Sequence, residues 1–435
     1  MRILDWNTLG ESERRAALAR PAQSDDISSL VREVVGAVRK GGDAALRAYT
    51  KRFDAVDVVN LQVTPAEFAA ARQTLSAKQI AAIETAISNV ERFHTPQMPA
   101  PLEVETVSGV RCERVIRPIL AVGMYVPAGT APLPSAVVMI AVPARIAGCP
   151  RRVLCTAPNR EGNANAAVLV AAQLCGVDTV FKVGGAQAIA AMAYGTESIP
   201  KVDKICGPGS AFVTAAKQLV AADPAGAACD LPAGPSEVMV VADTYARADF
   251  VAADLLAQAE HDTQAQALLV TTSQSLAQAV LACIETQVRE LSRRHILDES
   301  LAASRCIVVP SLETAIAVAN DYAPEHLILE VREPRRWLPS IQNAGSIFLG
   351  AWSPESLGDY CSGTNHVLPT YGYARAYSGL SVLDFIKRIT VQELTPAGLQ
   401  SLGPVAVTLA QLEGLDAHAQ AVTRRLAVLE SGTPS

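Results

Sequence analysis

Apolar residues recur with a helical period through the first hundred residues of the chain. In residues 27–40 they stand three or four positions apart, and the glycine pair 41–42 follows. Residues 76–93 repeat this spacing. Positions three and four apart share one face of an α-helix, so both segments are predicted to be amphipathic helices, the first ending at the glycine pair.

From residue 110 onward, short β-rich runs alternate with helical ones in two successive series. The first series predicts strands at 118–125, 152–155, 179–183 and 202–206, with helices at 135–146, 164–174, 186–194 and 211–221. The second predicts strands at 237–241, 268–271, 306–309, 326–330 and 346–349, with helices that include 248–260 and 276–291. Alternation of this kind indicates parallel sheets covered by helices on both faces, which is an α/β fold.

The length of the chain and its last segment bear on its organisation. The 435 residues exceed the roughly 250–300 at which a single core stops growing, so at least two domains are expected. From about residue 378 the pattern is helical again and ends in 405–429 without a strand partner. We expect this terminal segment to pack on a second subunit.

Charge and cysteine usage narrow the function classes. The formal net charge is −6 and no long basic run is present, which argues against nucleic acid or an anionic membrane as a partner. No uncharged apolar run reaches the roughly 18 residues that a membrane span needs. The nine cysteines are dispersed without a C-x-x-C pair, and the N-terminus lacks a signal-peptide core. These features predict a cytoplasmic protein.

Histidines are scarce and concentrated. Only six occur, five of them in the second half of the chain. Glu325 and His326 stand side by side in an apolar, strand-like setting. Histidine is the side chain whose pKa lies nearest neutrality, so this pair is a candidate for proton transfer. A lone histidine on an apolar element can also be a satisfied core residue, but four histidines near groups that bind metal or move protons favour chemistry.

Two segments offer metal ligands. Gln258 and His261 lie three positions apart near the end of a predicted helix, so both can face one point, and a divalent ion such as Zn²⁺ accepts a carbonyl oxygen and an imidazole nitrogen. Asp359 and His366 lie in a polar, glycine-bearing loop. A polar helix end and an Asp-capped turn explain these residues equally well. In the terminal segment, Glu413 and His418 read as a solvated helix face unless this tail reaches an active site.

Three glycine-containing turns precede predicted helices, at 127–130, 184–187 and 207–210. Helix N-termini attract phosphates, so a nucleotide could bind across these turns. None completes the dinucleotide pattern G-x-G-x-x-G, and the third turn leaves Phe212 where the last glycine would stand. Tight turns that need glycine explain them at least as well.

Taken together, motifs spread over nearly the whole chain resemble those of the histidinol dehydrogenase family. The motifs, in order, are PLPSAVVMIAVPARIAGC (132–149), VGGAQAIAAMAYGTE (183–197), VDKICGPGSAFVTAAK (202–217), DLPAGPSEV (230–238), LLAQAEHD (255–262), YAPEHL (322–327) and SPESLGDYCSGTNHVLPTYGYA (353–374). A joint match of this extent is far more specific than any one motif.

The resemblance implies two incomplete Rossmann-like parallel-sheet domains, a helical N-terminal region and a helical C-terminal tail exchanged in a homodimer. We therefore predict an N-terminal arm at 1–22, a first domain at 23–118 plus 237–377, a second, NAD-side domain at 119–236, and the tail at 378–435. The implied activity is the zinc-dependent oxidation of L-histidinol to L-histidine through an aldehyde, with two NAD⁺ consumed, as the last step of histidine biosynthesis.

The resemblance also implies roles for individual residues. One Zn²⁺ per subunit would be held by Gln258, His261, Asp359 and, from the partner subunit, His418. Glu325 and His326 would be catalytic, with His326 as the general base and Glu325 activating water. L-histidinol would contact Ser236, Gln258, His261, His326, Asp359, His366, Glu413 and His418, and NAD would contact Tyr125, Gln187 and Ser210.

Two positions depart from the family pattern. Ser210 stands where the family commonly has asparagine, which puts a direct contact to NAD in doubt, and Ala128 replaces a usual glycine. Two rival functions stay open at this point: a non-catalytic metal-binding or assembly protein, and a dehydrogenase for a different small alcohol.

Overall fold

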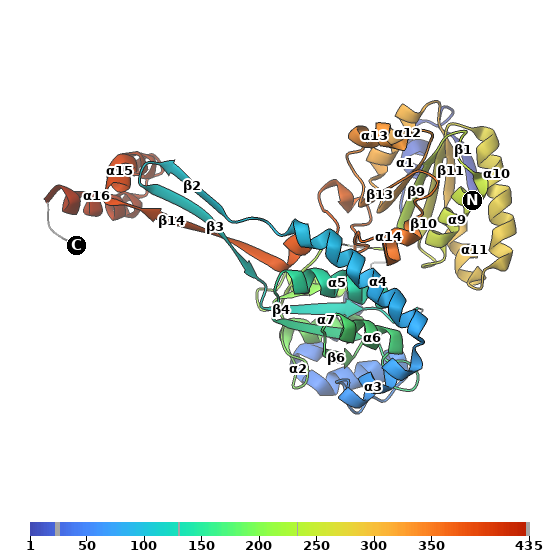
Figure 1. The fold of residues 1–435 in the computed structure, drawn as a ribbon, viewed down its shortest axis with the longest axis horizontal. Helices are drawn as coiled ribbons and strands as arrows, with labels where there is room; N and C mark the ends of the chain where they lie inside the picture. The colour runs from blue at the N-terminus through green and yellow to red at the C-terminus, as the bar shows by residue number, and fades with distance from the viewer. Residues whose placement is uncertain (22–26, 129–130, 233, 432–435) are drawn as a thin grey trace. The chain divides into compact units, whose positions relative to one another are not determined.

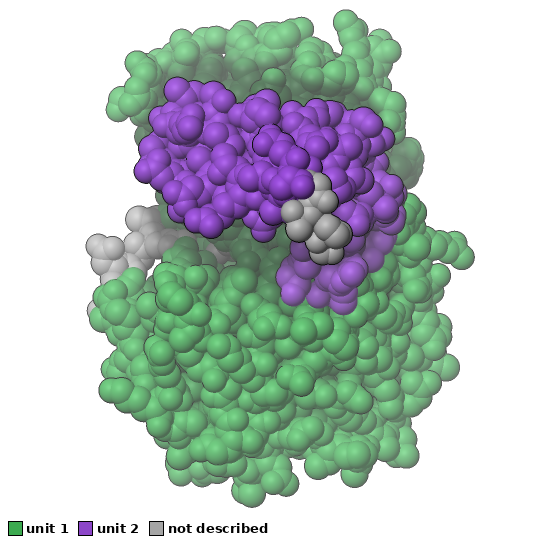
Figure 2. All heavy atoms as spheres, turned by 90° about the vertical axis from the view of Figure 1, so that its left-hand side faces the viewer, with its two compact units in different colours: residues 1–97, 119–385 green, residues 98–118, 386–435 purple. Residues whose placement is uncertain are grey.

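The computed structural model describes residues 1–21, 27–128, 131–232 and 234–431. The chain forms two compact units, coloured separately in Figure 2. Unit 1 comprises Met1–Gln97 and Ile119–Phe385, and unit 2 comprises Met98–Pro118 and Ile386–Ser435.

Unit 1 contains a six-stranded parallel sheet in the order β1-β11-β10-β9-β12-β13 (Figure 1). Its strands are β1 (Arg2–Asp5), β9 (Glu237–Ala242), β10 (Gln266–Thr271), β11 (Arg305–Val308), β12 (His326–Glu330) and β13 (Ser346–Leu349). The five strands predicted from 237 to 349 are confirmed. The N-terminal strand β1 was not foreseen; it pairs with β11 at one edge of the sheet.

Both faces of this sheet are buried under helices. Along β9, Val238 and Val240 join one apolar core, while Met239 and Val241 join the other. The first core is closed by α9 (Ala248–Ala259), α10 (Gln274–Gln287) and α11 (Arg294–Ala303), and the second by α1 (Glu11–Ala17) and α12 (Leu312–Tyr322). Successive strand residues point to opposite faces, so a strand covered on both sides is apolar throughout, as β9 is after Glu237.

A second parallel sheet of five strands has the order β6-β5-β4-β7-β8. Its strands are β4 (Ala121–Val126), β5 (Arg151–Thr156), β6 (Thr179–Lys182), β7 (Lys204–Cys206) and β8 (Ala228–Cys229). One face is covered by α2 (Ile27–Asp54), α7 (Gly185–Tyr194) and α8 (Ala211–Ala221), whose apolar residues form one core with the strands. The crossover helices α5 (Pro134–Ile146) and α6 (Ala166–Leu174) pack on each other, with α3 (Pro65–Thr74) and α4 (Ala77–His94) against them.

Helix α2 differs from its predicted extent. The prediction ended it at the glycine pair 41–42, but the helix continues to Asp54 with a kink at Gly42. Gly42 has φ 50°, and a Cβ there would collide with the Glu197 carboxylate. The second glycine therefore bends the helix instead of ending it, because only glycine fits that backbone and that space.

Unit 2 combines a small antiparallel sheet with two helices. Its sheet order is β14-β3-β2. The elements are β2 (Leu102–Val107), β3 (Val110–Pro118), β14 (Ile386–Leu394), α15 (Pro396–Leu412) and α16 (Asp416–Ser431). The prediction of a helical pattern from residue 378 onward is wrong for β14, which pairs along its whole length with β3. The helical character predicted for 405–429 is confirmed, although the segment forms two helices, α15 and α16.

The α/β fold with two helix-covered parallel sheets is therefore confirmed. The exchange of the tail in a dimer and the domain boundaries at 22, 118, 236 and 377 stay predictions. α2 packs on α7 and α8 beside the five-stranded sheet, although the predicted grouping joined residues 23–118 to 237–377. Among the described residues, no helix is long and apolar enough to cross a membrane.

Candidate active site

The predicted catalytic pair lies where two central strands of the six-stranded sheet begin. His326 is the first residue of β12, and Glu325 directly precedes it. The neighbouring strand β9 begins at Glu237, whose backbone N–H donates to Glu325 Oε2 over 2.8 Å. Ser236, a predicted substrate contact, precedes β9 and is partly buried. Parallel pairing of β12 with β9 thus brings three predicted site residues together at the amino ends of these two strands.

His326 is buried and surrounded by acceptors. Its Nδ1 lies 3.2 Å from the Glu237 carbonyl oxygen, 3.7 Å from Glu325 Oε2 and 3.6 Å from Glu355 Oε1. Its Nε2 lies 3.5 Å from Asp359 Oδ1 and is buried without a hydrogen-bond partner among the described residues. A buried polar atom without a partner usually marks a place where something else binds. His326 Nε2 is therefore free to meet a ligand or a substrate proton.

Gln258, near the end of α9, is fully buried beside this histidine. Its amide nitrogen lies 3.0 Å from Glu355 Oε1 and 3.1 Å from the Glu237 carbonyl oxygen, and donates to both acceptors. The same nitrogen lies 3.0 Å from His326 Nδ1. With the nitrogen engaged in these bonds, the amide oxygen is the atom of Gln258 that has the chemistry of a metal ligand.

Sequence reasoning missed Glu355, the first residue of the short helix α14 (Glu355–Tyr360). Ligand atoms of His261, Glu355 and Asp359 lie within 4.8 Å of one another, with Glu355 and Asp359 buried and His261 exposed. The one signal in the sequence for Glu355 was its position in the SPESLGDY motif, four residues before Asp359 and thus about one helical turn away.

The donor chemistry of this cluster fits a divalent cation. Imidazole, carboxylate and amide oxygen are ligands that Zn²⁺ accepts. His366 contacts the backbone of Asp359, since His366 Nδ1 lies 2.7 Å from the Asp359 carbonyl oxygen. The structure thus brings the predicted ligands His261 and Asp359 together, with Gln258 three residues before His261 at the end of α9.

Charges in the cluster are strongly coupled. Burial raises the pKa of Glu325 to about 8, and the nearby His326 charge only partly opposes this. Burial also raises the pKa of Glu355 well above its usual value. Burial alone would lower the pKa of His326, but the charges of Glu355 and Glu325 outweigh it and raise that pKa. A site with three buried acids around one imidazole gains stability from added positive charge.

The predicted cofactor residues belong to the five-stranded sheet and its helices. They lie near the carboxyl ends of its strands, whereas the catalytic pair lies at the amino ends of strands in the six-stranded sheet. Tyr125 is the fifth of six residues in β4, and its hydroxyl accepts a hydrogen bond of 3.0 Å from the N–H of Gly185. Gln187 is buried in the first turn of α7, and the exposed Ser210 is the residue before α8. All three lie at or beyond the carboxyl ends of the five parallel strands, where open α/β sheets bind ligands. Of the turn at 127–130, Gly129 and Thr130 lie outside the described residues.

The last two predicted site residues belong to unit 2. Glu413 is the residue after α15, and His418 lies in the first turn of α16. Both side chains are exposed. Their predicted place in a partner's active site stays a prediction.

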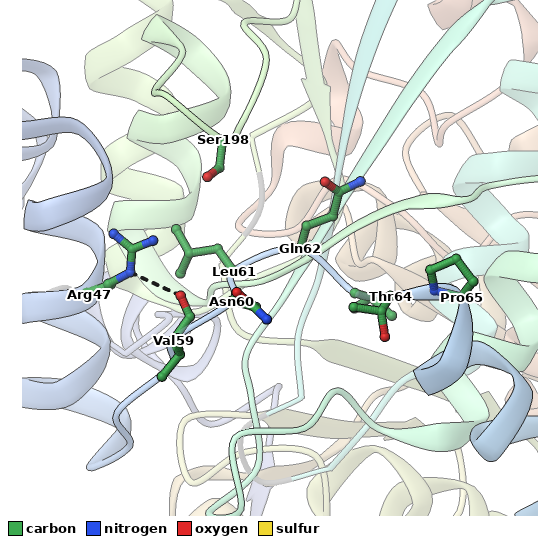
Figure 3. Close-up of a pocket in the computed structure, with 9 residues that line it drawn as sticks. Arg47, Val59, Asn60, Leu61, Gln62, Thr64, Pro65 and Ser198 are labelled. Atoms are coloured by element: carbon green, nitrogen blue, oxygen red, sulfur yellow. Dashed lines mark hydrogen bonds between the residues drawn. The ribbon is translucent and has the colours of Figure 1, made fainter.

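A separate cavity of about 440 Å³ lies in unit 1 (Figure 3). Arg47 borders it from α2 and donates to the Val59 carbonyl oxygen over 3.3 Å. The segment that follows, around Leu61, pairs with β6 at the sheet edge. None of the predicted site residues lines this cavity, so it plays no part in the candidate active site.

Comparisons with known proteins identify the family of the chain. The family model described as histidinol dehydrogenase matches residues 18–426. The chain is 52% identical over 433 residues to the histidinol dehydrogenase of Vibrio vulnificus (strain CMCP6), covering 99% of this chain and 100% of that protein. It is 53% identical over 432 residues to that of Xanthomonas euvesicatoria pv. vesicatoria (strain 85-10), covering 98% and 100%. A crystal structure of histidinol dehydrogenase from Elizabethkingia anophelis matches with a TM-score of 0.94 and 46% identity, over 99% of both chains.

These matches over nearly the whole chain, on an α/β fold, place it among the NAD-dependent oxidoreductases. More specifically, the chain belongs to the histidinol dehydrogenase family. The prediction drawn from its motifs is confirmed at this level.

Proposed function

We propose that this chain oxidises L-histidinol to L-histidine in histidine biosynthesis, passing four electrons to two NAD⁺. The observation that carries the proposal is His326, a buried imidazole with one unpartnered nitrogen beside a set of metal-ligand side chains. An alcohol oxidised twice needs a base that takes up a proton at each step, and this nitrogen is in position to do so.

A zinc ion, one per subunit, would be held by Gln258, His261 and Asp359, with the partner subunit's His418 as the fourth ligand. The ligand atoms of His261 and Asp359 lie close together, and the amide nitrogen of Gln258 is engaged by Glu355 and Glu237, so its oxygen is the atom that would bind the metal. A bound Zn²⁺ supplies a fixed positive charge that orients the nitrogens of histidinol and lowers the pKa of neighbouring acids and bases.

His326 acts as the general base in both oxidations. In the first, the alcohol loses a hydride to NAD⁺ and its proton to His326 Nε2, which gives the aldehyde. His326 then releases this proton to solvent, and in the second oxidation the hydrated aldehyde loses a hydride to the second NAD⁺ and a proton to the same nitrogen. A positioned base contributes roughly 10²–10⁴ in rate.

Glu325 activates the water that adds to the aldehyde between these two steps. Its carboxylate is held in place by the N–H of Glu237 over 2.8 Å, so it faces the same buried site as His326. Water addition produces the geminal diol that the second oxidation consumes. Glu325 thus acts in only one half of the reaction.

Residues around this core complete the substrate and cofactor contacts. Ser236, His366 and the partner subunit's Glu413 would hold histidinol, together with His326 and the metal ligands. Tyr125, Gln187 and Ser210 would line the NAD site. Support comes from three placements. Ser236 directly precedes β9, and His366 contacts the Asp359 carbonyl oxygen. Tyr125, Gln187 and Ser210 lie at the carboxyl ends of the five-stranded sheet.

One assay tests this function against its rivals. Purified protein is mixed with Zn²⁺, NAD⁺ and L-histidinol, and NADH is counted against substrate consumed. Two NADH per histidinol is the expected result. Zinc uptake without any NADH would indicate a non-catalytic metal-binding protein, and turnover with other primary alcohols alone would indicate a different dehydrogenase.

A further inference from the structure

A buried ion pair lies beside the five-stranded sheet, between two residues that have no role so far. Lys217 on α8 pairs with Asp230, which directly follows β8, and only 9% and 1% of their side chains are exposed. Burying two charges costs more than their attraction returns unless further hydrogen bonds satisfy them. The remaining partners of this pair therefore show what it is for.

Both charged side chains bind the backbone of one residue, Gly207. The Gly207 N–H donates to Asp230 Oδ2 over 2.7 Å. Lys217 Nζ donates to the Gly207 carbonyl oxygen over 3.0 Å. The two peptide groups that flank Gly207 are thus held from both sides by charge-assisted hydrogen bonds, the stronger kind.

Gly207 is in turn pressed against the strand that carries Tyr125. It follows β7 with φ 128°, and a Cβ there would collide with the Tyr125 carbonyl oxygen. Two residues on, a Cβ at Gly209 would collide with a methyl group of Val213 on α8. Only glycine allows both close approaches. The loop 207–210 therefore contacts β4 at Gly207 and α8 at Gly209.

Lys217 carries its charge at neutral pH. Burial tends to lower the pKa of Lys217, but the Asp230 carboxylate outweighs it and the pKa of Lys217 lies above its usual value. The ammonium group therefore keeps its protons and its hydrogen bond to Gly207.

We propose that the Lys217–Asp230 pair positions the 207–210 loop for the dinucleotide, fixing the backbone that presents Ser210 and the start of α8 beside Tyr125. This inference rests on the proposed use of NAD. Ser210 carries no side-chain cap for α8, so the first N–H groups of that helix stay available for a phosphate. Lys217 and Asp230 act through the loop and are positioning residues.

The test is a double variant, Lys217→Met with Asp230→Asn, assayed for NAD⁺ binding by titration calorimetry. Each single variant leaves one buried charge unpaired and is expected to damage the fold, whereas the double variant removes both charges. The amide introduced by Asp230→Asn keeps an oxygen for the Gly207 N–H, while the Gly207 carbonyl loses its ammonium donor. We expect the Kd for NAD⁺ to rise roughly 10-fold to 100-fold, since a hydrogen bond to a charged group is worth about 1.5–3 kcal/mol.

Three readouts separate loop positioning from general damage. The melting temperature, the zinc content and the KM for histidinol of the double variant should stay close to those of the unmodified protein. Lys204→Met is the matched control. Like Lys217, Lys204 donates to a main-chain carbonyl oxygen, that of Asp384 over 2.8 Å. Lys204 is the first residue of β7, however, at the end of that strand away from Gly207. This control should bind NAD⁺ normally.

The outcomes are distinct. An NAD⁺ affinity of the double variant within twofold of the unmodified protein would overturn the inference, as would equal losses of NAD⁺, zinc and histidinol binding. Failure of the unmodified protein itself to bind NAD⁺ would instead overturn the proposed function.

Discussion

At the scale of single residues, the chemistry depends on how few partners His326 Nε2 has. Its described neighbours are engaged with each other: Glu325 accepts from the backbone of Glu237, and Gln258 donates to Glu355. Within this group, Nε2 is the buried atom without a partner. The positive charge of a bound cation would lower the pKa of His326 and leave the Nε2 lone pair for the substrate.

The division of labour between His326 and Glu325 can be measured directly. Glu325→Gln removes the group that activates water but leaves His326, so oxidation of histidinaldehyde should slow by roughly 10²-fold or more while alcohol oxidation slows much less. Single-turnover kinetics with each substrate separates the two steps. Equal slowing of both half-reactions would contradict this division.

Glu355 is predicted to act on the metal through Gln258. Glu355→Met removes the acceptor that orients the Gln258 amide, so zinc affinity should fall roughly 10-fold to 100-fold, as for other groups that orient metal ligands. Competition with a chromophoric chelator measures this.

Glu330→Met is the matched control for Glu355, since Glu330 is a buried acid on the same strand as His326. It should leave zinc affinity unchanged. A Glu355→Met protein that binds zinc as tightly as the control would rule out the orienting role.

The sequence identified most of these residues but not their arrangement. Glu325, His326, Gln258 and His261 were found because their types suit proton transfer and metal binding. Glu355 was missed because an acid on a short helix looks like an ordinary first-turn residue. Only the fold brings it within 3.0 Å of Gln258, which is 97 positions away in the chain.

At the scale of elements, local periodicity predicted the central strands, the helices that cover them and the helical tail, and it failed for β14. The central strands and their helices were predicted because both faces or one stripe are apolar. β14 was missed because its residues after Ile386 are exposed, so no stripe marks it as a strand. It forms by pairing with β3, more than 260 residues earlier, which local sequence cannot reveal.

The kinked helix α2 is held by Asp43, which follows Gly42. Its Oδ1 accepts from the Thr196 hydroxyl over 2.7 Å and from the Ser198 N–H over 3.2 Å. Burial would raise the pKa of Asp43, but these hydrogen bonds prevail and lower it. A carboxyl whose pKa is lowered by folding stabilises the fold above its unfolded pKa, and this contribution disappears as pH falls through the folded pKa.

Asp43→Asn should therefore destabilise the protein near neutral pH by about 1.5–3 kcal/mol, the value of a hydrogen bond to a charged group. The difference from the unmodified protein should shrink below about pH 4, where the unfolded carboxyl is protonated. Denaturant unfolding at several pH values measures it. Asp57→Asn, at an exposed ion pair with Lys51, is the control and should change stability by less than about 1 kcal/mol. A loss at Asp43 that is independent of pH would contradict the charge argument.

At the scale of the whole molecule, the proposed site draws on residues from both units. Unit 1 supplies His261, Asp359 and Gln258, whereas Glu413 and His418 belong to unit 2 and are exposed. Unit 2 also exposes large apolar residues, among them Val405, Leu409 and Leu412 on α15. Exposed apolar residues that gather on one element mark an interaction surface. A second copy of the chain that covers α15 and takes His418 into its own active site would account for both features.

This arrangement predicts that two inactive proteins restore activity when combined. Glu325→Gln and His418→Ala subunits are co-expressed with different affinity tags, and the mixed dimer is isolated by purification on both. If each active site takes His418 from the partner, one site of the mixed dimer carries both substitutions and the other carries neither. The mixed dimer should then have about half the activity of the unmodified dimer, because a two-fold symmetric dimer has two equivalent sites. If His418 served its own subunit, each site would carry one substitution and the mixed dimer would stay as inactive as its parents.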